Sequence, residues 1–261
     1  MDIVGKVALV TGAGSGIGRA SAVRLAAENA SVVVVDVNEH GADETVAQIE
    51  AAGGKAARTR ADVTSIHDVK AMIEFAERTY GGLDILHNNA GIITGEPRYP
   101  DNEPEHWMRM LEINLTGVIL GTQFAIHAMK KRGGGAIVNT ASMAGIGYGF
   151  APNPVYSASK GGVVLFTASM APWKDEANIR INCVCPGVVD TPMARGGAQL
   201  SDTEEKAFYE RFAALQIIAP EEIADVVVEF VKDDSLAGRA MMVRNGRPRE
   251  LVRTSDLPRL F

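Results

Sequence analysis

Short apolar runs alternate with amphipathic stretches along almost the whole of this chain. Each run is typical of a buried strand, whereas the stretches between them repeat apolar residues at helical spacing. The expected strands lie at about 5–11, 31–36, 56–61, 83–88, 135–140, 179–185 and 239–243, and the expected helices at about 17–29, 39–52, 66–80, 104–131, 156–170 and 220–232. This alternation predicts an α/β fold, with a mainly parallel sheet and right-handed crossovers that place helices on both faces.

Two stretches interrupt the alternation. Residues 92–103 are rich in proline and polar groups and predict a loop, while 186–219 form an insertion before the last helix. In open α/β sheets, ligands bind beyond the carboxyl ends of the strands. We therefore expect residues at about 190–219, with a hinge at Gly196 and Gly197, to form a substrate lid. A pair of surface helices that caps the core is the alternative.

Composition and charge limit the classes of partner. The chain has 261 residues, of which 46% are hydrophobic and 22% charged, as in an ordinary soluble globular protein. Its net charge of −6 gives no general attraction to nucleic acid or to an anionic membrane. The N-terminus does not resemble a signal peptide, and no apolar run reaches the ~20 residues of a membrane span. We expect a cytoplasmic protein with a small-molecule substrate.

The cysteine and histidine patterns predict neither a disulfide nor a metal site. Cys183 and Cys185 lie two apart on one expected strand, so both face the same side and a bridge between them would be strained. Two buried thiols in a reducing compartment are expected. None of the five histidines has close metal-ligand spacing. His87, on the expected fourth strand, is interpreted as a core residue.

A glycine-rich turn follows the first expected strand. Glycines occupy alternate positions from Gly12 to Gly18, and the next apolar run, 31–36, ends at Asp36. The glycines allow a sharp turn that brings backbone N–H groups close to a pyrophosphate at the start of the following helix. An acid at the end of the second strand meets the ribose hydroxyls in Rossmann folds. This order predicts a dinucleotide site, and a glycine-rich turn without a ligand is the alternative.

With that site, the expected architecture is a single-domain, Rossmann-like, three-layer sandwich with a seven-stranded sheet. No repeat or low-complexity linker divides the chain. The nucleotide-binding domain is expected to cover 1–246, and residues 247–261 are expected to form an irregular tail.

Tyr156 and Lys160 lie four residues apart, 14 residues after Ser142. On a helix, positions i and i+4 share a face, so the ammonium group would lie beside the phenol. A neighbouring cation favours the phenolate and lowers the pKa of the tyrosine, as a general base requires. The spacing alone is common by chance, and an ordinary solvent-facing pair is the alternative.

In these motifs the chain closely resembles the short-chain dehydrogenase/reductase family over its first 233 residues. The family pattern T-G-x-x-x-G-x-G matches Thr11–Gly18, its acid-plus-apolar pair matches Asp62-Val63, and its N-N-A-G motif matches Asn88–Gly91. The helix asparagine of the family matches Asn114, and its catalytic serine, tyrosine and lysine match Ser142, Tyr156 and Lys160. The P-G-x-x-x-T turn matches Pro186–Thr191. Parts of the sequence, including Asn153 to Tyr156, are also similar to 15-hydroxyprostaglandin dehydrogenase-like members, without establishing such a substrate.

The resemblance implies specific roles. Tyr156 would exchange a proton with the substrate oxygen, while Lys160 lowers its pKa and holds the nicotinamide ribose. Ser142 would hydrogen-bond the substrate oxygen, and Asn114 would position a water that passes the proton outward. The implied cofactor contacts are Gly12, Ser15, Gly16, Ile17, Gly18, Asp36, Asp62, Val63, Asn89, Ala90, Gly91, Tyr156, Lys160, Pro186, Gly187, Val189 and Thr191.

The residues after the second strand favour NAD. Asp36 is followed by Val37 and Asn38, and Ser15 stands where NADP users of the family often place a basic residue. A 2′-phosphate would meet a carboxylate without a neighbouring cation.

The chain departs from the family in three places, of which the third is a tail that carries Arg253 and Arg259 without a periodic pattern. Pro172 falls where the catalytic helix usually continues, so that helix should kink or end early. The usual glycine-ending acidic turn after the last strand is replaced by 244–248. Relatives use these surfaces for subunit contacts, so a homo-oligomer, tetramer or dimer, is expected without a choice between them.

Three function classes remain open at this point. The leading hypothesis is an NAD-dependent dehydrogenase of a secondary alcohol. The second is an isomerase or dehydratase that uses the cofactor transiently, and the third is a nucleotide sensor without turnover. The expected substrate is neutral and bulky or cyclic, because the expected lining is mostly apolar and burial of an unpaired carboxylate is costly. No arginine is clearly placed to pair with a carboxylate, though Arg98 and Arg195 lie in candidate loops. Its expected contacts are Ser142, Tyr148, Phe150, Asn153, Tyr156, Met193 and Phe208, with Ile93, Ile146 and Phe212 as further apolar candidates.

Overall fold

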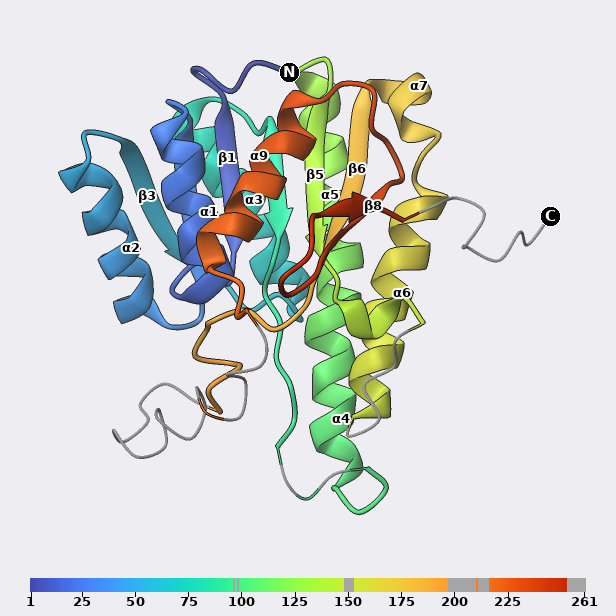
Figure 1. Cartoon of the computed structure of the whole chain (residues 1–261). Coiled ribbons are helices and arrows are strands. Elements are labelled where there is room, and N and C mark those ends of the chain that lie inside the picture. Colours follow the sequence, from blue (N-terminus) through green and yellow to red (C-terminus); the bar gives the residue numbers. More distant parts are fainter. Residues whose placement is uncertain (96, 98, 148–152, 197–209, 211–215, 253–261) are drawn as a thin grey trace.

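The computed structural model describes residues 1–95, 97, 99–147, 153–196, 210 and 216–252 (Figure 1). Its strands are β1 Val7–Thr11, β2 Ser31–Asp36, β3 Lys55–Arg60, β4 Ile85–Asn88, β5 Gly135–Thr140, β6 Ile179–Pro186, β7 Ala240–Val243 and β8 Glu250–Leu251. Its helices are α1 Gly16–Ala27, α2 Glu39–Ala51, α3 Ile66–Tyr80, α4 Pro104–Leu111, the π-helix η1 Glu112–Thr116, α5 Gly117–Lys131, the 3₁₀ turn η2 Met143–Gly145, α6 Pro154–Ser169, α7 Trp173–Ala177 and α9 Pro220–Lys232.

The strands form one sheet in the order β3-β2-β1-β4-β5-β6-β7-β8. All neighbours from β3 to β7 pair in parallel, and β8 pairs antiparallel with β7. The strand order reverses between β1 and β4, so the connections after these two strands diverge at their carboxyl ends. Such a switch point is where open α/β sheets bind ligands. The α/β class predicted from the alternation is confirmed.

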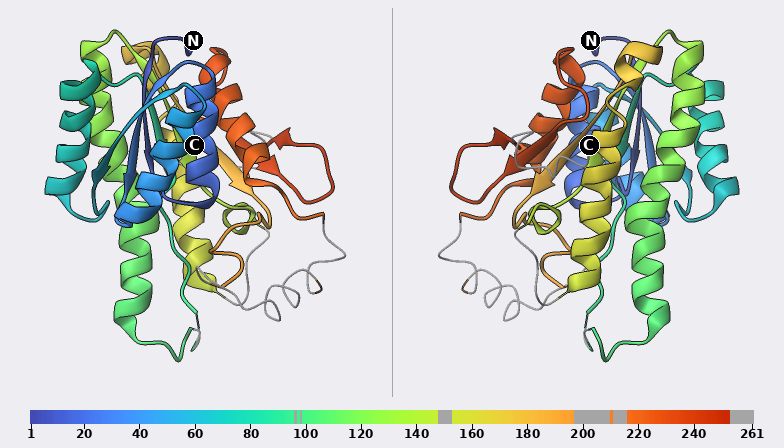
Figure 2. Two further views of the ribbon diagram at one scale, coloured as in Figure 1. Left: turned by 90° about the vertical axis from the view of Figure 1, so that its left-hand side faces the viewer. Right: turned by 90° about the vertical axis from the view of Figure 1, so that its right-hand side faces the viewer.

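The valine run of β2 shows why the sheet carries helices on both faces. Successive strand side chains point to opposite faces, so Val32 and Val34 pack in the core beneath α1, α2 and α9. Val33 and Val35 pack in the core beneath α3 and α5. Figure 2 shows the sheet between these two helical layers. A continuous apolar run is typical of such a doubly covered parallel strand.

The prediction of seven strands misses β8, which lies within the segment predicted to be irregular. Only two residues form this strand, through the pairs Met241–Leu251 and Met242–Glu250. A strand this short has no measurable side-chain period, so its pairing partner alone defines it. The segment 244–249 between β7 and β8 is therefore a hairpin connection that returns to the sheet edge.

The helix predicted over 104–131 is divided by the π-helical turn at 112–116. The apolar period cannot reveal such a turn, because the flanking helices α4 and α5 keep helical spacing. Pro172 ends the catalytic helix early, as predicted: α6 stops at Ser169 and α7 begins after the proline. Cys183 and Cys185 are buried and unbridged. Among the described residues, no helix is both long and apolar enough to cross a membrane.

Candidate active site

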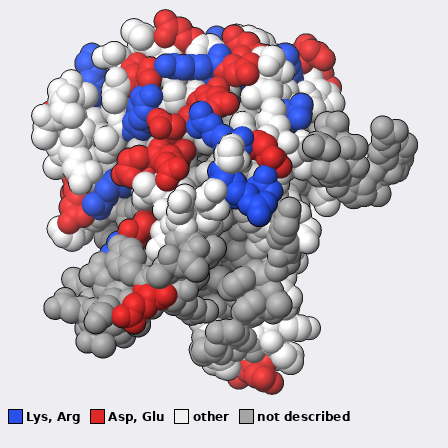
Figure 3. Space-filling model, viewed as in Figure 1, with Lys and Arg blue, Asp and Glu red and all other residues white. Residues whose placement is uncertain are grey.

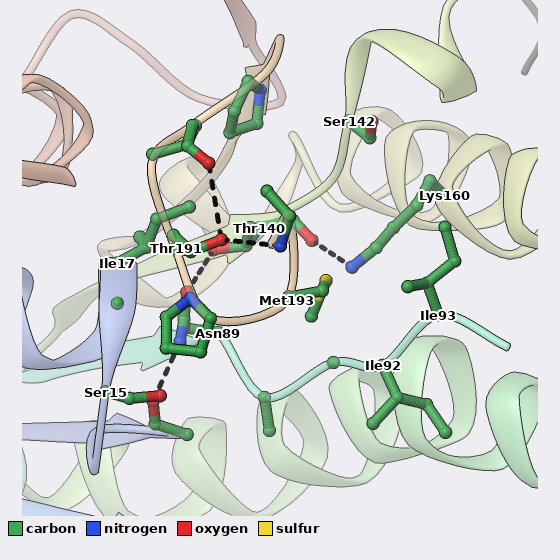
Figure 4. A pocket seen from close by; sticks show the side chains of 18 of the residues that line it. Ser15, Ile17, Asn89, Ile92, Ile93, Thr140, Ser142, Lys160, Thr191 and Met193 are labelled. Atoms are coloured by element: carbon green, nitrogen blue, oxygen red, sulfur yellow. Dashed lines mark hydrogen bonds between the residues drawn. The ribbon is translucent and has the colours of Figure 1, made fainter. Parts of the chain in front are cut away.

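A cavity of about 1350 Å³ opens where β1, β4, β5 and β6 end (Figure 4). It brings together all the predicted cofactor residues except Gly18, along with Ser142 and Met193. Figure 4 shows Ser15 and Ile17 at the left, Ile92 and Ile93 at the right, and Thr191 and Met193 between them. Segments more than 100 residues apart in the chain thus share one cavity.

The glycine turn leaves the start of α1 open to an anion. The N-cap residue Ser15 makes no side-chain capping bond, and the first turn holds no acidic residue. The first backbone N–H groups of a helix have no partner within it, and they carry partial positive charge. A pyrophosphate therefore fits this position without displacing a side chain.

Two of the glycines are required by close approach. Gly12 has φ +63°, and a Cβ there would lie 2.9 Å from Cα of Ala90 after β4. A Cβ on Gly18 would overlap the carbonyl oxygen of Gly12. Gly18 therefore packs α1 closely onto the turn, and its predicted contact with the cofactor stays a prediction.

Asp36 closes β2 and also holds the glycine turn. One carboxylate oxygen accepts a hydrogen bond from the Gly14 N–H at 2.8 Å, and the other accepts from the Asn38 N–H at 2.8 Å. Each oxygen retains a lone pair for a ribose hydroxyl. The nearby Arg19 is already engaged, because its guanidinium lies 2.6 Å from Glu44 and donates to the Gly14 carbonyl.

Asp62 and Val63 form the wall after β3. Burial disfavours the Asp62 carboxylate, but hydrogen bonds from Thr64 and Arg109 lower its pKa below the ordinary value. The guanidinium of Arg109, on α4, lies 2.6 Å from the Asp62 carboxylate. Arg109 could not be found from local patterns, because its pairing with Asp62 joins residues 47 apart in the chain.

A directed chain of hydrogen bonds joins β5 to the glycine turn. The Asn89 amide donates to the carbonyls of Thr11 and Gly12 at 3.1 and 3.3 Å, and its oxygen accepts from the Thr140 hydroxyl at 3.2 Å. Because that hydroxyl has one proton, the His87 Nε2 at 2.9 Å must donate to it. Burial lowers the pKa of His87 to about 3, so the ring is neutral. His87 is thus a core residue, as interpreted, and Thr140 is a pocket residue that sequence reasoning missed.

The N-terminal half of α6 carries Tyr156 and Lys160. Asn153 caps the helix by accepting a hydrogen bond from the Tyr156 N–H at 2.9 Å, and Ser142, at the start of η2, hydrogen-bonds the phenol. The ammonium group of Lys160 donates to the carbonyl oxygen of Thr140 at 2.8 Å, as drawn in Figure 4. The predicted trio therefore lies together at the end of β5.

The electrostatics differ from the predicted ones. Burial raises the pKa of Tyr156, and the hydrogen bond from Ser142 offsets only part of this increase. Burial also lowers the pKa of Lys160 to about 8. The Lys160 nitrogen lies 5.9 Å from the centre of the Tyr156 ring and is turned to the Thr140 carbonyl. The net pKa of Tyr156 is therefore raised in this arrangement, and a lowering of it by Lys160 stays a prediction.

Asn114 is buried in the π-helical turn and does not line the cavity. Its amide pairs with both backbone groups of Ile92, at 2.8 and 2.9 Å, and donates to Ser159 on α6 at 3.3 Å. A Cβ on Gly91 would lie 3.3 Å from the Asn114 oxygen and 3.4 Å from the Lys160 nitrogen. Asn114 and Lys160 thus approach Gly91 closely, and the predicted water positioned by Asn114 stays a prediction.

Asn245, in the β7–β8 connection, holds the turn after β6. Its amide accepts from the Val188 N–H at 2.9 Å and donates to the carbonyls of Val188 and Gln216, both at 2.9 Å. A Cβ on Gly187 would overlap the Asn245 amide oxygen. The departure from the family turn therefore places a side chain against the predicted nicotinamide site, which the sequence could not show.

The predicted substrate contacts are only partly placed. Met193 lines the cavity and is 42% exposed, and Ile93 also lines it. Asn153 does not line it, because its side chain caps α6 and donates to Thr94. Tyr148, Phe150, Gly197, Phe208 and Phe212 lie outside the described residues, as does most of the predicted lid.

Comparisons with known proteins agree with this geometry. Residues 6–200 match the family model described as short chain dehydrogenase. A cyclohexanol dehydrogenase from Acinetobacter sp. (strain SE19) is 40% identical over 230 residues, 88% of this chain and 89% of the relative. A cis-4-hydroxycyclohexanecarboxylate dehydrogenase from Sinomonas cyclohexanicum is 40% identical over 87% of this chain and 90% of the relative.

Among solved structures, a variant of actinorhodin polyketide ketoreductase with NADPH is 35% identical to this chain. The two superpose with a TM-score of 0.84 over 92% of this chain and 96% of the other. Similar proteins thus include dehydrogenases of cyclic alcohols and a ketoreductase with NADPH, so the choice between NAD and NADP depends on this chain's own residues.

Proposed function

Because the chain belongs to the short-chain dehydrogenase family, we propose that it is an NAD-dependent dehydrogenase of cyclic or bulky apolar secondary alcohols. Family membership makes it an oxidoreductase with a nicotinamide cofactor. The finer assignments, NAD and the class of alcohol, rest on the residues around Asp36 and on the apolar wall beside Ser142.

The cavity fits a dinucleotide. The open start of α1 accepts the pyrophosphate, Asp36 accepts hydrogen bonds from the adenosine ribose, and the wall formed by Asp62 and Val63 meets the adenine. When bound, the nicotinamide accepts or supplies the hydride. Lys160 and the turn after β6 position it, and Asn245 keeps that turn in place.

Tyr156 is the proton-transfer group in this proposal. It is the ionisable hydroxyl beside Ser142, whose own hydroxyl orients the substrate oxygen. Lys160 supplies a positive charge that favours phenolate formation during proton transfer, since a pKa of about 8 keeps its ammonium group protonated at neutral pH. Asn114, which accepts a hydrogen bond from the Ile92 N–H, positions the water through which the proton leaves in this proposal.

The surroundings of Asp36 carry the assignment of NAD. A 2′-phosphate would approach a carboxylate, and the cation next to the turn, Arg19, is paired with Glu44. Val37, which is 55% exposed beside Asp36, has no charge to offer. Two like charges within a few ångströms repel, so NADP would bind more weakly than NAD.

Steady-state kinetics with cyclohexanol and each cofactor test this assignment. We expect kcat/KM for NAD to exceed that for NADP by about 10²-fold or more, roughly 3 kcal/mol. The double substitution Asp36→Ala with Val37→Arg should move the preference toward NADP. Val4→Arg, at an equally exposed position away from the cavity, is the control for an added arginine. Equal efficiencies with both cofactors in the unaltered protein would refute the assignment.

The apolar wall supports the substrate class. Ile92, Ile93, Met143 and Met193 line the same cavity as Ser142 and Tyr156. Burial of apolar ring carbons against such side chains stabilises a complex by roughly 25 cal/mol per Å². A small alcohol buries less area, so cyclohexanol should have a lower Michaelis constant than 2-propanol. Absorbance at 340 nm measures the NADH formed, and NADH binding without turnover of any alcohol would favour a sensor instead.

A homo-oligomer is also part of the proposal. Met108, Ile119 and Leu165, on α4, α5 and α6, are 49%, 37% and 47% exposed. Large apolar side chains on neighbouring helices are suited to a subunit interface. Analytical ultracentrifugation should find a dimer or tetramer, and a monomer at micromolar concentration would refute it.

A further inference from the structure

The cavity is lined by acidic and basic side chains that are not evenly paired. Among the described residues that line it, the acidic side chains are Asp36 and Asp62, which both lie where the adenosine is expected. Of the lining arginines, Arg109 pairs with Asp62, whereas Arg195, Arg244 and Arg247 have no acidic neighbour within the lining. The chain as a whole carries a net charge of −6, so this basic part of the lining is a local feature.

The β7–β8 connection brings two of these arginines to the cavity. Met242, on β7, packs in the same cluster as Val163 and Val164 of the catalytic helix α6. Arg244 follows two residues later, just beyond the end of the strand, and lines the cavity that also contains Tyr156. Figure 3 shows Lys and Arg side chains gathered over this hairpin.

Neither arginine is fully neutralised. The guanidinium of Arg244 lies 2.9 Å from Glu250, a carboxylate that is 53% exposed, and its enclosed Nε–H has no hydrogen-bond partner. Arg247 is exposed, and no carboxylate of the described residues lies within ion-pair distance of it. Arg195 differs, because Asp190 lies 2.6 Å from it. Arg244 and Arg247 together therefore offer at least one uncompensated positive charge.

We propose that Arg244 and Arg247 form an anion-binding end of the substrate pocket. It would select secondary alcohols whose apolar body carries a carboxylate remote from the reacting carbon. Guanidinium groups pair with carboxylates through paired N–H donors, and a basic wall attracts an anion before contact. This inference rests on the proposed function and narrows its substrate class. It also differs from the expectation of a neutral substrate, which rested on a mostly apolar lining.

A cofactor phosphate is the other anion that could meet these arginines. The pyrophosphate is expected at the start of α1, which approaches the cavity from β1 on the opposite side of the switch point. Arg244 instead follows β7, three strands further along the sheet from β4. The position thus favours the substrate, and the experiment separates the two sources.

The test compares one ring with and without its charge. The substrates are 4-hydroxycyclohexanecarboxylate and its methyl ester, which share the reacting alcohol. We expect a higher kcat/KM for the acid than for the ester with the unaltered protein. Arg244→Gln should lower the acid-to-ester ratio by about tenfold or more, as for a lost hydrogen bond to a charged group. Arg247→Gln should lower it as well, and Arg244→Lys should retain part of it.

Arg249→Gln is the matched control, because Arg249 lies in the same hairpin, pairs with Glu229 and does not line the cavity. Its acid-to-ester ratio should equal that of the unaltered protein. A separate titration with NADH, followed by fluorescence, should give the same dissociation constant for all variants. Weaker NADH binding in Arg244→Gln with an unchanged ratio would assign the arginines to the cofactor and overturn the proposal.

The proposal and the proposed function fail in different ways. If the ester is turned over and the ratio of kcat/KM for the acid to that for the ester is one or less, the anion site is refuted and the proposed dehydrogenase function stands. Absence of turnover with every alcohol would refute the proposed function instead. Arg247 is exposed, so its substitution tests the site even if Arg244→Gln disturbs the hairpin.

Discussion

Replacement of Lys160 by methionine should change how the stability of this protein depends on pH. The Lys160 ammonium is 3% exposed, and burial lowers its pKa from 10.5 to about 8. A difference of about 2.5 pKa units corresponds to about 3 kcal/mol between the charged and neutral forms. Methionine keeps most of the side-chain volume and removes the titrating group.

The sign follows from proton binding in the two states. Below pH 8, the folded and unfolded chains both carry the Lys160 proton, and the folded chain bears the full cost of burying the charge. Between about pH 8 and 10.5, the unfolded chain retains a proton that the folded chain has lost, so stability rises with pH. From pH 7 to 9.5 the unaltered protein should gain about 2 kcal/mol relative to Lys160→Met.

Urea denaturation of both proteins at pH 7 and 9.5 measures this gain. Groups common to the two proteins cancel in the difference between them. The Cys185 thiol near Lys160 stays neutral over this range, because a hydrogen bond with Cys183 and burial raise its pKa. Lys70→Met is the control, since that side chain is exposed on α3 and should show no such gain. A difference between Lys160→Met and the unaltered protein that does not change with pH would refute the burial argument.

Three further changes test the site. Tyr156→Phe should lower turnover at least ~10²-fold while NADH binding survives, and near-normal turnover would mean that another group transfers the proton. Burial raises the pKa of Tyr156, so its phenol should stay protonated up to pH 9.5 without cofactor. The absorbance difference at 295 nm between the unaltered protein and Tyr156→Phe measures this, and a phenolate signal below pH 9.5 would contradict the raised pKa. Asn245→Ala frees the Val188 backbone and should raise KM for NAD several-fold. Asn245→Asp accepts from the Val188 N–H but cannot donate to its carbonyl, so its KM should stay close to that of Asn245→Ala. A KM for Asn245→Asp equal to that of the unaltered protein would rule out the amide pairing.

Much of the fold could be predicted from local patterns. The apolar run from 31 to 36 predicts a strand buried on both faces, and β2 is that strand. Glycine spacing from 12 to 18 predicts the turn into α1, because only glycine allows the backbone approach seen at Gly12. Pro172 predicts the end of α6 for an equally local reason, since its ring blocks a helical hydrogen bond. Such features depend on neighbours within one element.

The site divides in the same way. Asp36, Ser142, Tyr156 and Lys160 could be identified from spacing, since each stands at a characteristic place in the chain. Their protonation could not, because it depends on burial by elements distant in sequence. Lys160 lies on α6, and its ammonium group donates to the carbonyl of Thr140 on β5 rather than to the phenol. Burial at this position lowers the pKa of Lys160.

Pairings between distant segments were decided by the tertiary structure alone. β8 exists only because it meets β7, and Arg109 matters only because α4 lies against the end of β3. Arg244 and Asn245 read in sequence as an unusual turn, yet the parallel pairing of β6 and β7 sets that turn beside Gly187. A sequence specifies which residues can turn, bury or ionise over a few positions. Which side chains then share one cavity, and what that cavity does to their charge, follows from strand order and packing across the whole sheet.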